Sequence, residues 1–325
     1  MRLLAPHWSI YLAGLPTVRE ALMIEIPTVL VLGAGSSVHC GYPLGGQLVS
    51  QLSRLRGSPE LDSLPGGWTR DEAEDFLTRL SRSGHYSIDA FLESNREQAD
   101  LGKYLIAREL KKHEDLEALF PPNNSGWYQY LLNRLLSDDG TPDFAANRLT
   151  IVTFNYDRSL EAYLHAAVQA RLHGDEDQAA AILDGLRVIH VHGVLGDYPA
   201  VPYERDVPLD ELVLISRQIQ IIHEIKDRDD GFCNPMFEEA NTWLSNAERI
   251  YFLGFGFHPD NVRRFRFFTP DSTSGKLVRG TTTGLGALER SSLHGVLAPA
   301  GFTPEMLPPD GVNCNNFFSR AGSLD

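Results

Sequence analysis

The chain has 325 residues, 42% of them hydrophobic, which is enough for one large α/β domain with an insertion or for two modest domains. Its 43 acidic residues outnumber its 29 basic residues, so the electrostatic field of the whole chain repels phosphate backbones and argues against direct nucleic-acid binding. Three cysteines lie far apart without a Cys-x-x-Cys pair, and no apolar run reaches the roughly 18 residues that cross a membrane. We therefore expect a cytoplasmic protein without a disulfide framework, a zinc ribbon or membrane attachment.

The first predicted elements are a strand, a tight turn and a helix. Residues 28–35, "TVLVLGAG", form an aliphatic and β-branched run that ends in glycines, which is typical of a strand buried on both faces of a parallel sheet. Residues 43–55 then show the apolar spacing of a helix. Helical spacing continues over about residues 68–145 without a strand-like run, which predicts an inserted helical block.

Strand character then returns four times, at residues 148–157, 186–193, 210–216 and 248–257. Helical patterns separate the first two of these runs and the last two. Alternating strands and helices predict an α/β fold with a Rossmann-like, doubly wound parallel sheet and an inserted helical block.

The pattern divides the chain into three parts. Residues 28–268 are interpreted as one Rossmann-like nucleotide-binding domain. Residues 1–27 are interpreted as an N-terminal extension, because charge and proline interrupt them before a convincing signal sequence. Residues 269–325, rich in glycine, threonine, serine and proline, are interpreted as a C-terminal segment for assembly or partner contact.

The first glycine stretch has the character of a nucleotide-binding turn. Gly33 and Gly35 stand where a strand turns sharply and where backbone N–H groups approach a phosphate. The third glycine of the dehydrogenase pattern G-x-G-x-x-G would fall on Val38, and no acidic strand end follows about 20 residues later. An ordinary dehydrogenase therefore fits poorly.

Four short motifs at predicted strand ends, "GAGSSVHCGYP", "TFNYD", "HVHG" and "GFGFHPDN", stand in the order found in the sirtuin superfamily, which they resemble. The resemblance implies that NAD is bound and that its nicotinamide–ribose bond is cleaved. In the last motif Gly256 stands where many relatives carry serine. The NAD-binding residues that the resemblance implies are Gly33, Ala34, Gly35, Ser36, Ser37, Gly41, Pro43, Thr153, Gly193, Gly254 and Gly256.

The resemblance also implies three catalytic residues. His192 takes the place of the catalytic histidine, and a neutral imidazole can accept a proton from a ribose hydroxyl or from water. Asn155 is expected to position the ribose or the water, because its amide offers both a donor and an acceptor. Asp157 is expected to support Asn155, with a helix cap as the alternative role.

The two histidines of "HVHG" leave further alternatives. His190 and His192 are two residues apart on one predicted strand, so both are either core histidines or the start of a zinc site. A zinc site needs further ligands, for which His258 and Asp260 are candidates without diagnostic spacing. We expect no metal.

The resemblance is nearer to the sirtuin-like NAD hydrolases of bacterial antiphage defence than to protein deacylases. Deacylases of the superfamily typically carry a zinc module with two cysteine pairs, and in the corresponding region of this chain only Cys233 appears. The inserted helical block also matches relatives dedicated to plain hydrolysis. The expected products are nicotinamide and ADP-ribose, with NAD as a substrate.

A hydrolase that depletes NAD has to be gated. The resemblance implies control by homo-oligomerisation or by a separately encoded partner, of which a HerA-type ATPase is the first expectation and a short Argonaute the alternative. Two other functions remain open from the sequence: an NAD-dependent protein deacylase and a non-catalytic sensor of NAD or ADP-ribose.

Overall fold

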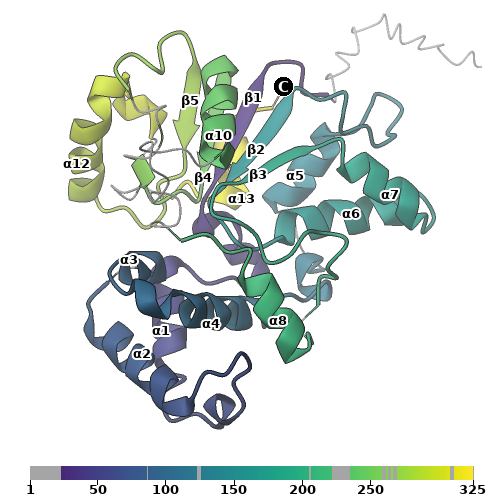
Figure 1. The fold of residues 1–325 in the computed structure, drawn as a ribbon. Coiled ribbons are helices and arrows are strands. Elements are labelled where there is room, and N and C mark those ends of the chain that lie inside the picture. Colours follow the sequence, from purple (N-terminus) through teal and green to yellow (C-terminus); the bar gives the residue numbers. More distant parts are fainter. Residues whose placement is uncertain are drawn as a thin grey trace, which may run out of the picture.

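The structure is a computed structural model that describes residues 23–324, apart from residues 86, 123–125, 205, 222–234, 258–260, 263–264, 266–268 and 308–310. Most of the expected N-terminal extension therefore lies outside the described residues. The described chain forms one parallel sheet with the strand order β3-β2-β1-β4-β5 (Figure 1). The strands are β1 (Thr28–Leu32), β2 (Leu149–Thr153), β3 (Arg187–His190), β4 (Arg249–Leu253) and β5 (Leu277–Gly280). This confirms the predicted α/β class and the doubly wound parallel sheet.

Helices cover both faces of the sheet (Figure 1). Every residue of β1, β2 and β4 is buried, as their aliphatic composition predicts. Side chains alternate along β1: Leu30 and Leu32 belong to one core cluster, and Val29 and Val31 to the other. The helices are α1 (Gly45–Ser53), α2 (Arg70–Arg82), α3 (Ile88–Glu93), α4 (Ala99–Lys111), α5 (Trp127–Arg134), α6 (Ser159–Arg171), α7 (Glu176–Leu183), α8 (Leu209–Ser216), α10 (Pro235–Asn246), α12 (Ala287–Leu297) and α13 (Cys314–Arg320).

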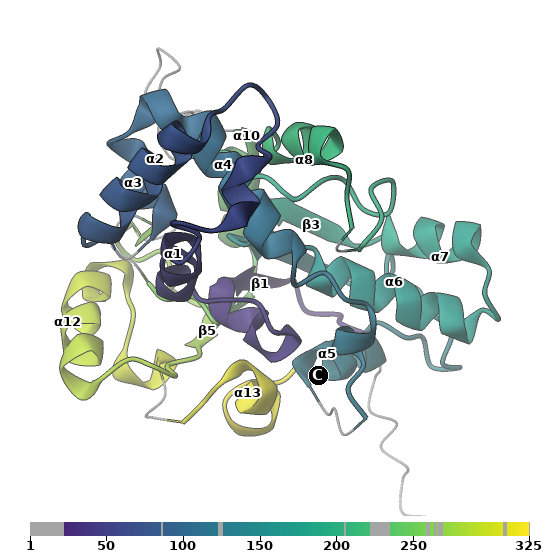
Figure 2. The same ribbon diagram turned by 90° about the horizontal axis from the view of Figure 1, so that it is seen from below.

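The predicted helical block is present, and it divides into two parts. Helices α2, α3 and α4 lie together with α1 and α8 in a layer below the sheet (Figure 1). Helix α5 instead packs beside α6 against the sheet, with α13 next to it (Figure 2). The layer of α1 to α4 faces the ends of the strands, where ligands of open α/β sheets bind.

One predicted strand is wrong: residues 210–216 belong to helix α8. Residues 212–215 form a short continuous apolar run, which in sequence alone resembles a buried strand. The buried ones, Leu212 and Ile215, are nevertheless three residues apart, as on one face of a helix. Pro208 precedes the first turn, and Asp210 lies near the positive N-terminal end of the helix dipole. The residues at the start of the helix therefore outweigh the strand-like character of this short apolar run.

The fifth strand comes from the part of the chain that the sequence left outside the sheet. Strand β5 pairs in parallel with β4, with Ile250 opposite Val278. It has four residues and lies at the edge of the sheet, where its Leu277 is exposed. Such a short, half-exposed strand has no aliphatic run to reveal it in the sequence. The sheet thus includes residues beyond 268.

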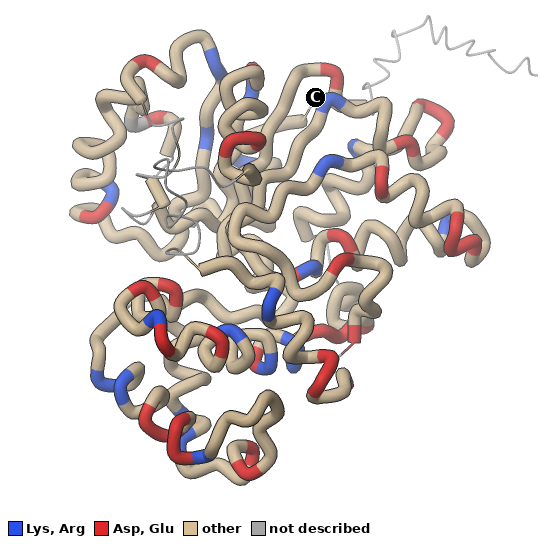
Figure 3. The backbone as a smooth tube through the Cα atoms, in the orientation of Figure 1, with Lys and Arg blue, Asp and Glu red and all other residues tan. Residues whose placement is uncertain are grey.

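Basic and acidic positions alternate over much of the described chain. Lys and Arg positions are interspersed with Asp and Glu positions along the described tube (Figure 3). No helix in the described part of the chain is long and apolar enough to cross a membrane.

Candidate functional site

A cavity of about 390 Å³ lies at the carboxyl ends of β1, β2 and β4. We call it the strand-end cavity. Its walls come from the turn after β1, the start of α1, the start of α3, the residues after β2 and β4, and His192. Strands β2 and β4 flank β1 on opposite sides, so the cavity lies at the point where the strand order reverses. Its volume is within the range of small-molecule sites.

The turns after β1 and β4 interlock at the floor of this cavity. We call residues 33–37 the glycine loop. The N–H of Gly35 donates to the carbonyl of Gly254 at 3.1 Å, and a Cβ added to Gly254 would lie 2.1 Å from the nitrogen of Ser36. Gly254 also has φ of +61°, which favours glycine. Two of the predicted motifs are thus glycine-rich because two backbones touch, and Gly33, Gly35 and Gly254 all line the cavity.

Helix α1 begins at the cavity wall. Pro43 and residues 44–46, the N-cap and first residues of α1, line the cavity. The first turn of an α-helix leaves backbone N–H groups without partners inside the helix and carries the positive end of the helix dipole. Together with the glycine loop, this arrangement can bind a phosphate or pyrophosphate through the backbone.

Asn155 connects the end of β2 to the glycine loop. Its carboxamide nitrogen lies 3.2 Å from the carbonyl oxygen of Gly33, 3.1 Å from Oγ of Ser36 and 3.2 Å from Oγ of Ser37. Its backbone N–H donates to Oγ1 of Thr153 at 3.0 Å. The side chain is 8% exposed and lines the cavity, so its orientation is determined by the loop that it holds.

Asp157 contacts two segments, the start of α6 and the glycine loop. Its carboxylate accepts from the backbone N–H and the hydroxyl of Ser159, the first residue of α6, whereas the N-cap position itself is Arg158. It also accepts from the hydroxyl of Ser37 at 3.1 Å, and so reaches Asn155 through the glycine loop. Burial raises the pKa of Asp157, whereas these hydrogen bonds act to lower it.

His192 lies beyond the end of β3 and lines the cavity. It is 6% exposed, and its ring lies against Phe154 and Phe237, at centroid distances of 5.5 and 5.6 Å. Gly193 follows with φ of +79°, and a Cβ there would lie 1.9 Å from the carbonyl oxygen of Gln218. Glycine is therefore required at position 193, because only a residue without a Cβ lets the backbone after His192 pass so close to the carbonyl of Gln218.

His190, two residues before His192, does not line the strand-end cavity. Its Nδ1 is 3.0 Å from the carbonyl oxygen of Asn155, and its Nε2 is 2.7 Å from a carboxylate oxygen of Glu161 on α6. Within the described residues, no group of three or more His, Cys, Asp and Glu side chains could hold a metal ion. The other zinc candidates, His258 and Asp260, lie outside the described residues.

The structure thus brings most of the predicted residues to one cavity, whereas the others do not line it. Those that line the cavity are Gly33, Ala34, Gly35, Pro43, Asn155, Asp157, His192, Gly254 and Gly256. Those that do not are Ser36, Ser37, Gly41, Thr153 and Gly193, of which the two serines and Thr153 make hydrogen bonds with Asn155.

The helical block also contributes to the cavity, which no motif in the sequence predicts. Residues 87–90, at the start of α3, line the cavity, and Asp89 accepts a hydrogen bond from the hydroxyl of Tyr156. Tyr156 stands between Asn155 and Asp157, inside a motif that had been singled out. Asp89 has no local signal, because only the folded chain brings α3 to the end of β2.

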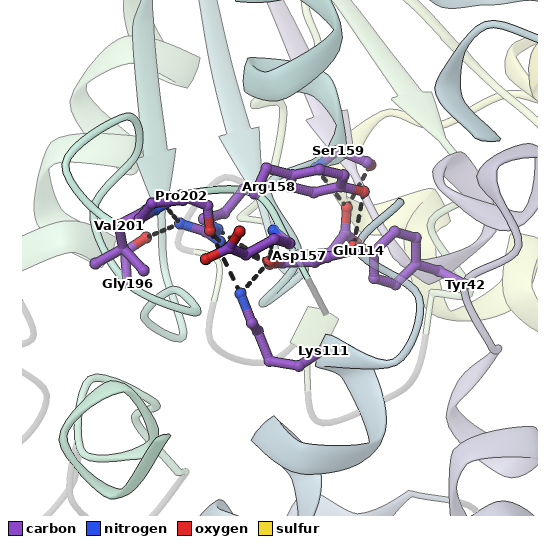
Figure 4. Close-up of polar contacts among 11 residues, drawn as sticks. Tyr42, Lys111, Glu114, Asp157, Arg158, Ser159, Gly196, Val201 and Pro202 are labelled. Atoms are coloured by element: carbon purple, nitrogen blue, oxygen red, sulfur yellow. Dashed lines mark hydrogen bonds and ion pairs between the residues drawn. The ribbon is translucent and has the colours of Figure 1, made fainter. Parts of the chain in front are cut away.

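A buried ionic cluster is formed by Lys111, Glu114 and Arg158, two of which follow the cavity-lining residues Leu110 and Asp157 in the chain (Figure 4). The guanidinium of Arg158 donates to both carboxylate oxygens of Glu114, and Lys111 forms an ion pair with the same carboxylate. The side chains of Arg158 and Glu114 are completely buried. Arg158 also donates to the backbone carbonyls of Gly196, Val201 and Pro202. The cluster therefore joins the end of α4 to the residues after β2 and to the segment that follows His192.

No protein-family model matches the chain, and no curated protein sequence matches it. The functional assignment accordingly depends on the four motifs and on the cavity in which they meet.

Proposed function

We propose that the protein binds NAD in the strand-end cavity and hydrolyses its nicotinamide–ribose bond, releasing nicotinamide and ADP-ribose. One observation carries this proposal: segments separated by up to about 220 residues, each resembling a sirtuin motif, supply walls of a single cavity. They are the glycine loop, the residues after β2, His192 and the turn after β4.

The cavity offers suitable groups for each part of the substrate. The backbone of the glycine loop and the start of α1 would hold the pyrophosphate. Cleavage of an N-ribosyl bond passes through a cationic, oxocarbenium-like state, and Asp89 and Asp157 are among the residues that line the cavity. These groups would favour the developing positive charge electrostatically when ionised.

The reaction needs a base and a positioned water. The oxygen of water forms a bond to the anomeric carbon, the bond from that carbon to the pyridinium nitrogen breaks, and nicotinamide leaves with the electron pair. His192 would accept the proton of the water, and Asn155 would position the ribose or the water. Asp157 would support Asn155 through Ser37.

In the cell we propose a gated effector that depletes NAD in antiphage defence. This part follows from the motif resemblance together with the toxicity that unregulated NAD hydrolysis would have. Gating would come from homo-oligomerisation or from a separately encoded sensor or activator, with a HerA-type ATPase as the first candidate and a short Argonaute as the second.

The test is nicotinamide release from NAD by the purified full-length protein, alone and with the products of neighbouring genes. His192→Ala and Asn155→Ala should each abolish release while far-UV circular dichroism stays unchanged. His173→Asn, at an exposed histidine that does not line the cavity, is the matched control and should keep full activity. Undiminished release by both cavity variants would refute the proposal.

The same assay separates the two other functions. A requirement for an acylated peptide would indicate a deacylase. Calorimetric binding of NAD without turnover, even with the partners present, would indicate a sensor.

A further inference from the structure

His190 contacts an acceptor at each of its two ring nitrogens. Nδ1 lies 3.0 Å from the backbone carbonyl oxygen of Asn155, and Nε2 lies 2.7 Å from a carboxylate oxygen of Glu161. A carbonyl oxygen cannot donate, and an ionised carboxylate cannot either. Both hydrogen bonds exist together only when each ring nitrogen carries a proton, which is the imidazolium form.

The surroundings of His190 favour that positive charge. The ring and the Glu161 carboxylate are only 12% and 14% exposed, so their attraction is weakly screened. They lie at a hollow of about 240 Å³, and its other lining residues include two carboxylates and one guanidinium. The ionisable side chains that share this hollow with His190 are those of Arg158, Glu161, Asp184, Asp197 and Tyr198. Burial by itself lowers the pKa of His190, but Glu161, the Asn155 carbonyl and Asp157 together raise it above its usual value.

Asn155 is therefore held from two sides. Its carboxamide nitrogen binds the glycine loop, and its backbone carbonyl binds His190. Because β3 lies next to β2 with His190 opposite Thr153, the histidine reaches the main chain just beyond the end of β2. A shift of that main chain would move the carboxamide of Asn155 within the cavity.

We propose that His190 is a positioning residue: as an imidazolium held between Glu161 and the Asn155 carbonyl, it fixes the main chain of Asn155 and hence its carboxamide in the cavity. This inference rests on the proposed NAD hydrolysis. It also separates the two histidines of "HVHG". His190, with both nitrogens protonated, has no lone pair for a metal ion or a substrate proton, so the role of base falls to His192.

The direction of the pH effect follows from the charge. The imidazolium is present below the pKa of His190 and is lost as the pH rises through it. The neutral ring keeps one proton for two acceptors, and the charge-assisted bond to Glu161 is the stronger, so the contact with the Asn155 carbonyl, and with it kcat, should decline on the alkaline side. Glu161→Gln removes the carboxylate that favours the charged form, so it should move this decline to lower pH by about one unit.

The experiment has two independent readouts on the full-length protein, with its activating partner if release requires one. The first is ¹⁵N NMR of the ring nitrogens of His190 and of the Asn155 carboxamide, recorded without NAD between about pH 6 and about pH 10. The second is kcat and KM for nicotinamide release over the same range. Spectra of His190→Gln and Asn155→Ala assign the signals, and Glu176→Gln, an exposed glutamate on α7, is the matched control for Glu161→Gln.

We expect an imidazolium spectrum for His190 at pH 7 and a shift of the Asn155 carboxamide signal when His190 loses its proton. Glu161→Gln should move both transitions to lower pH, and Glu176→Gln should move neither. His190→Gln should lower kcat about 10- to 100-fold with little change in KM, and should remove the alkaline limb.

A neutral His190 at pH 7, or an Asn155 signal that does not respond to its deprotonation, would overturn the inference whatever the activity. An unchanged kcat in His190→Gln would also overturn it. If both NMR transitions appear as expected and no variant or partner yields nicotinamide, the positioning of Asn155 stands and the proposed hydrolysis fails.

Discussion

The carboxamide nitrogen of Asn155 lies 3.2 Å from the carbonyl oxygen of Gly33, although 122 positions separate the two residues in the chain. The contact joins the end of β2 to the turn after β1 and brings two predicted motifs into one hydrogen-bonded unit. The hydroxyls of Ser36 and Ser37 complete that unit. Removing the amide donor should therefore disturb the loop as well as the cavity.

Asn155→Asp replaces the amide nitrogen by a carboxylate oxygen that faces the Gly33 carbonyl. We expect a loss of about 2–4 kcal/mol in the free energy of unfolding, because a buried donor is replaced by a repelled acceptor. NAD binding measured by calorimetry should weaken as well. The control is Asn313→Asp at the N-cap of α13, where aspartate caps as well as asparagine. Urea denaturation that shows equal stability for the two variants would contradict this account.

Gly254→Ala should be severely destabilising. The added Cβ would lie 2.1 Å from the backbone nitrogen of Ser36, and φ of +61° is strained for alanine. We expect a loss of more than about 3 kcal/mol or failure to fold, seen in thermal unfolding and soluble yield. Gly295→Ala is the matched control: this glycine lies in α12 with open space around it, so alanine should add about 0.5–1 kcal/mol. Similar melting temperatures for both variants would refute the interlocked turns.

Arg158→Met should leave the buried carboxylate of Glu114 with Lys111 as its remaining cation. Breaking a buried ion pair from one side costs about 3–5 kcal/mol, so chemical denaturation should show a loss of that size. The double variant Arg158→Met with Glu114→Leu should lose less than the sum of the single variants.

An exposed ion pair provides the comparison for that cluster. Arg187 and Glu239 are paired at 2.7 Å, with side chains that are 50% and 34% exposed. Glu239→Gln should cost less than about 1 kcal/mol. If Arg158→Met costs no more than this, the cluster does not hold α4 to the residues after β2.

Acid should weaken the fold through His39. Burial lowers the pKa of His39 to about 4, and its ring lies edge-on to Tyr128 at a centroid distance of 4.5 Å. The unfolded chain binds this proton near pH 6.5 and the folded chain only near pH 4, so stability falls as the pH drops through that window. The contribution is at most about 1.4 kcal/mol per pH unit, and less because the ring keeps some solvent contact.

This prediction is checked by measuring the urea midpoint of unfolding as a function of pH for the natural protein and for His39→Phe. The variant should show a shallower decline between about pH 6.5 and about pH 4. His173→Asn, at an exposed histidine, should leave the slope as it is. Parallel curves for His39→Phe and the natural protein would contradict the assignment.

Three of the four strands that the sequence predicted correctly, β1, β2 and β4, are fully buried, and the fourth, β3, is partly exposed. In β1, β2 and β4 every side chain is buried, so the aliphatic run and the following turn residues are a sufficient signal. The signal fails for helix α8 and for the edge strand β5. Helix α8 buries only part of its apolar side chains, and β5 has four residues at an edge, so their local patterns are ambiguous.

The residues of the strand-end cavity also divide into those that the sequence predicts and those that it does not. The glycines and polar residues after β1, β2 and β4 are visible in the sequence, because a tight turn after a buried strand requires particular residue types. The contact of Asp89 with Tyr156 is invisible, since it joins the helical block to β2 across 67 positions.

The sequence by itself determined which segments become buried parallel strands, and which residues stand where those strands end. Only the tertiary structure decided that Gly254 lies against Ser36, and that His190 and His192 have different surroundings two residues apart. The physical reason is that the two kinds of feature depend on interactions over different separations along the chain. Hydrophobic periodicity and backbone conformation depend on neighbours in the chain, whereas hydrogen-bond partners, burial and charge state depend on segments that meet only after the chain has folded.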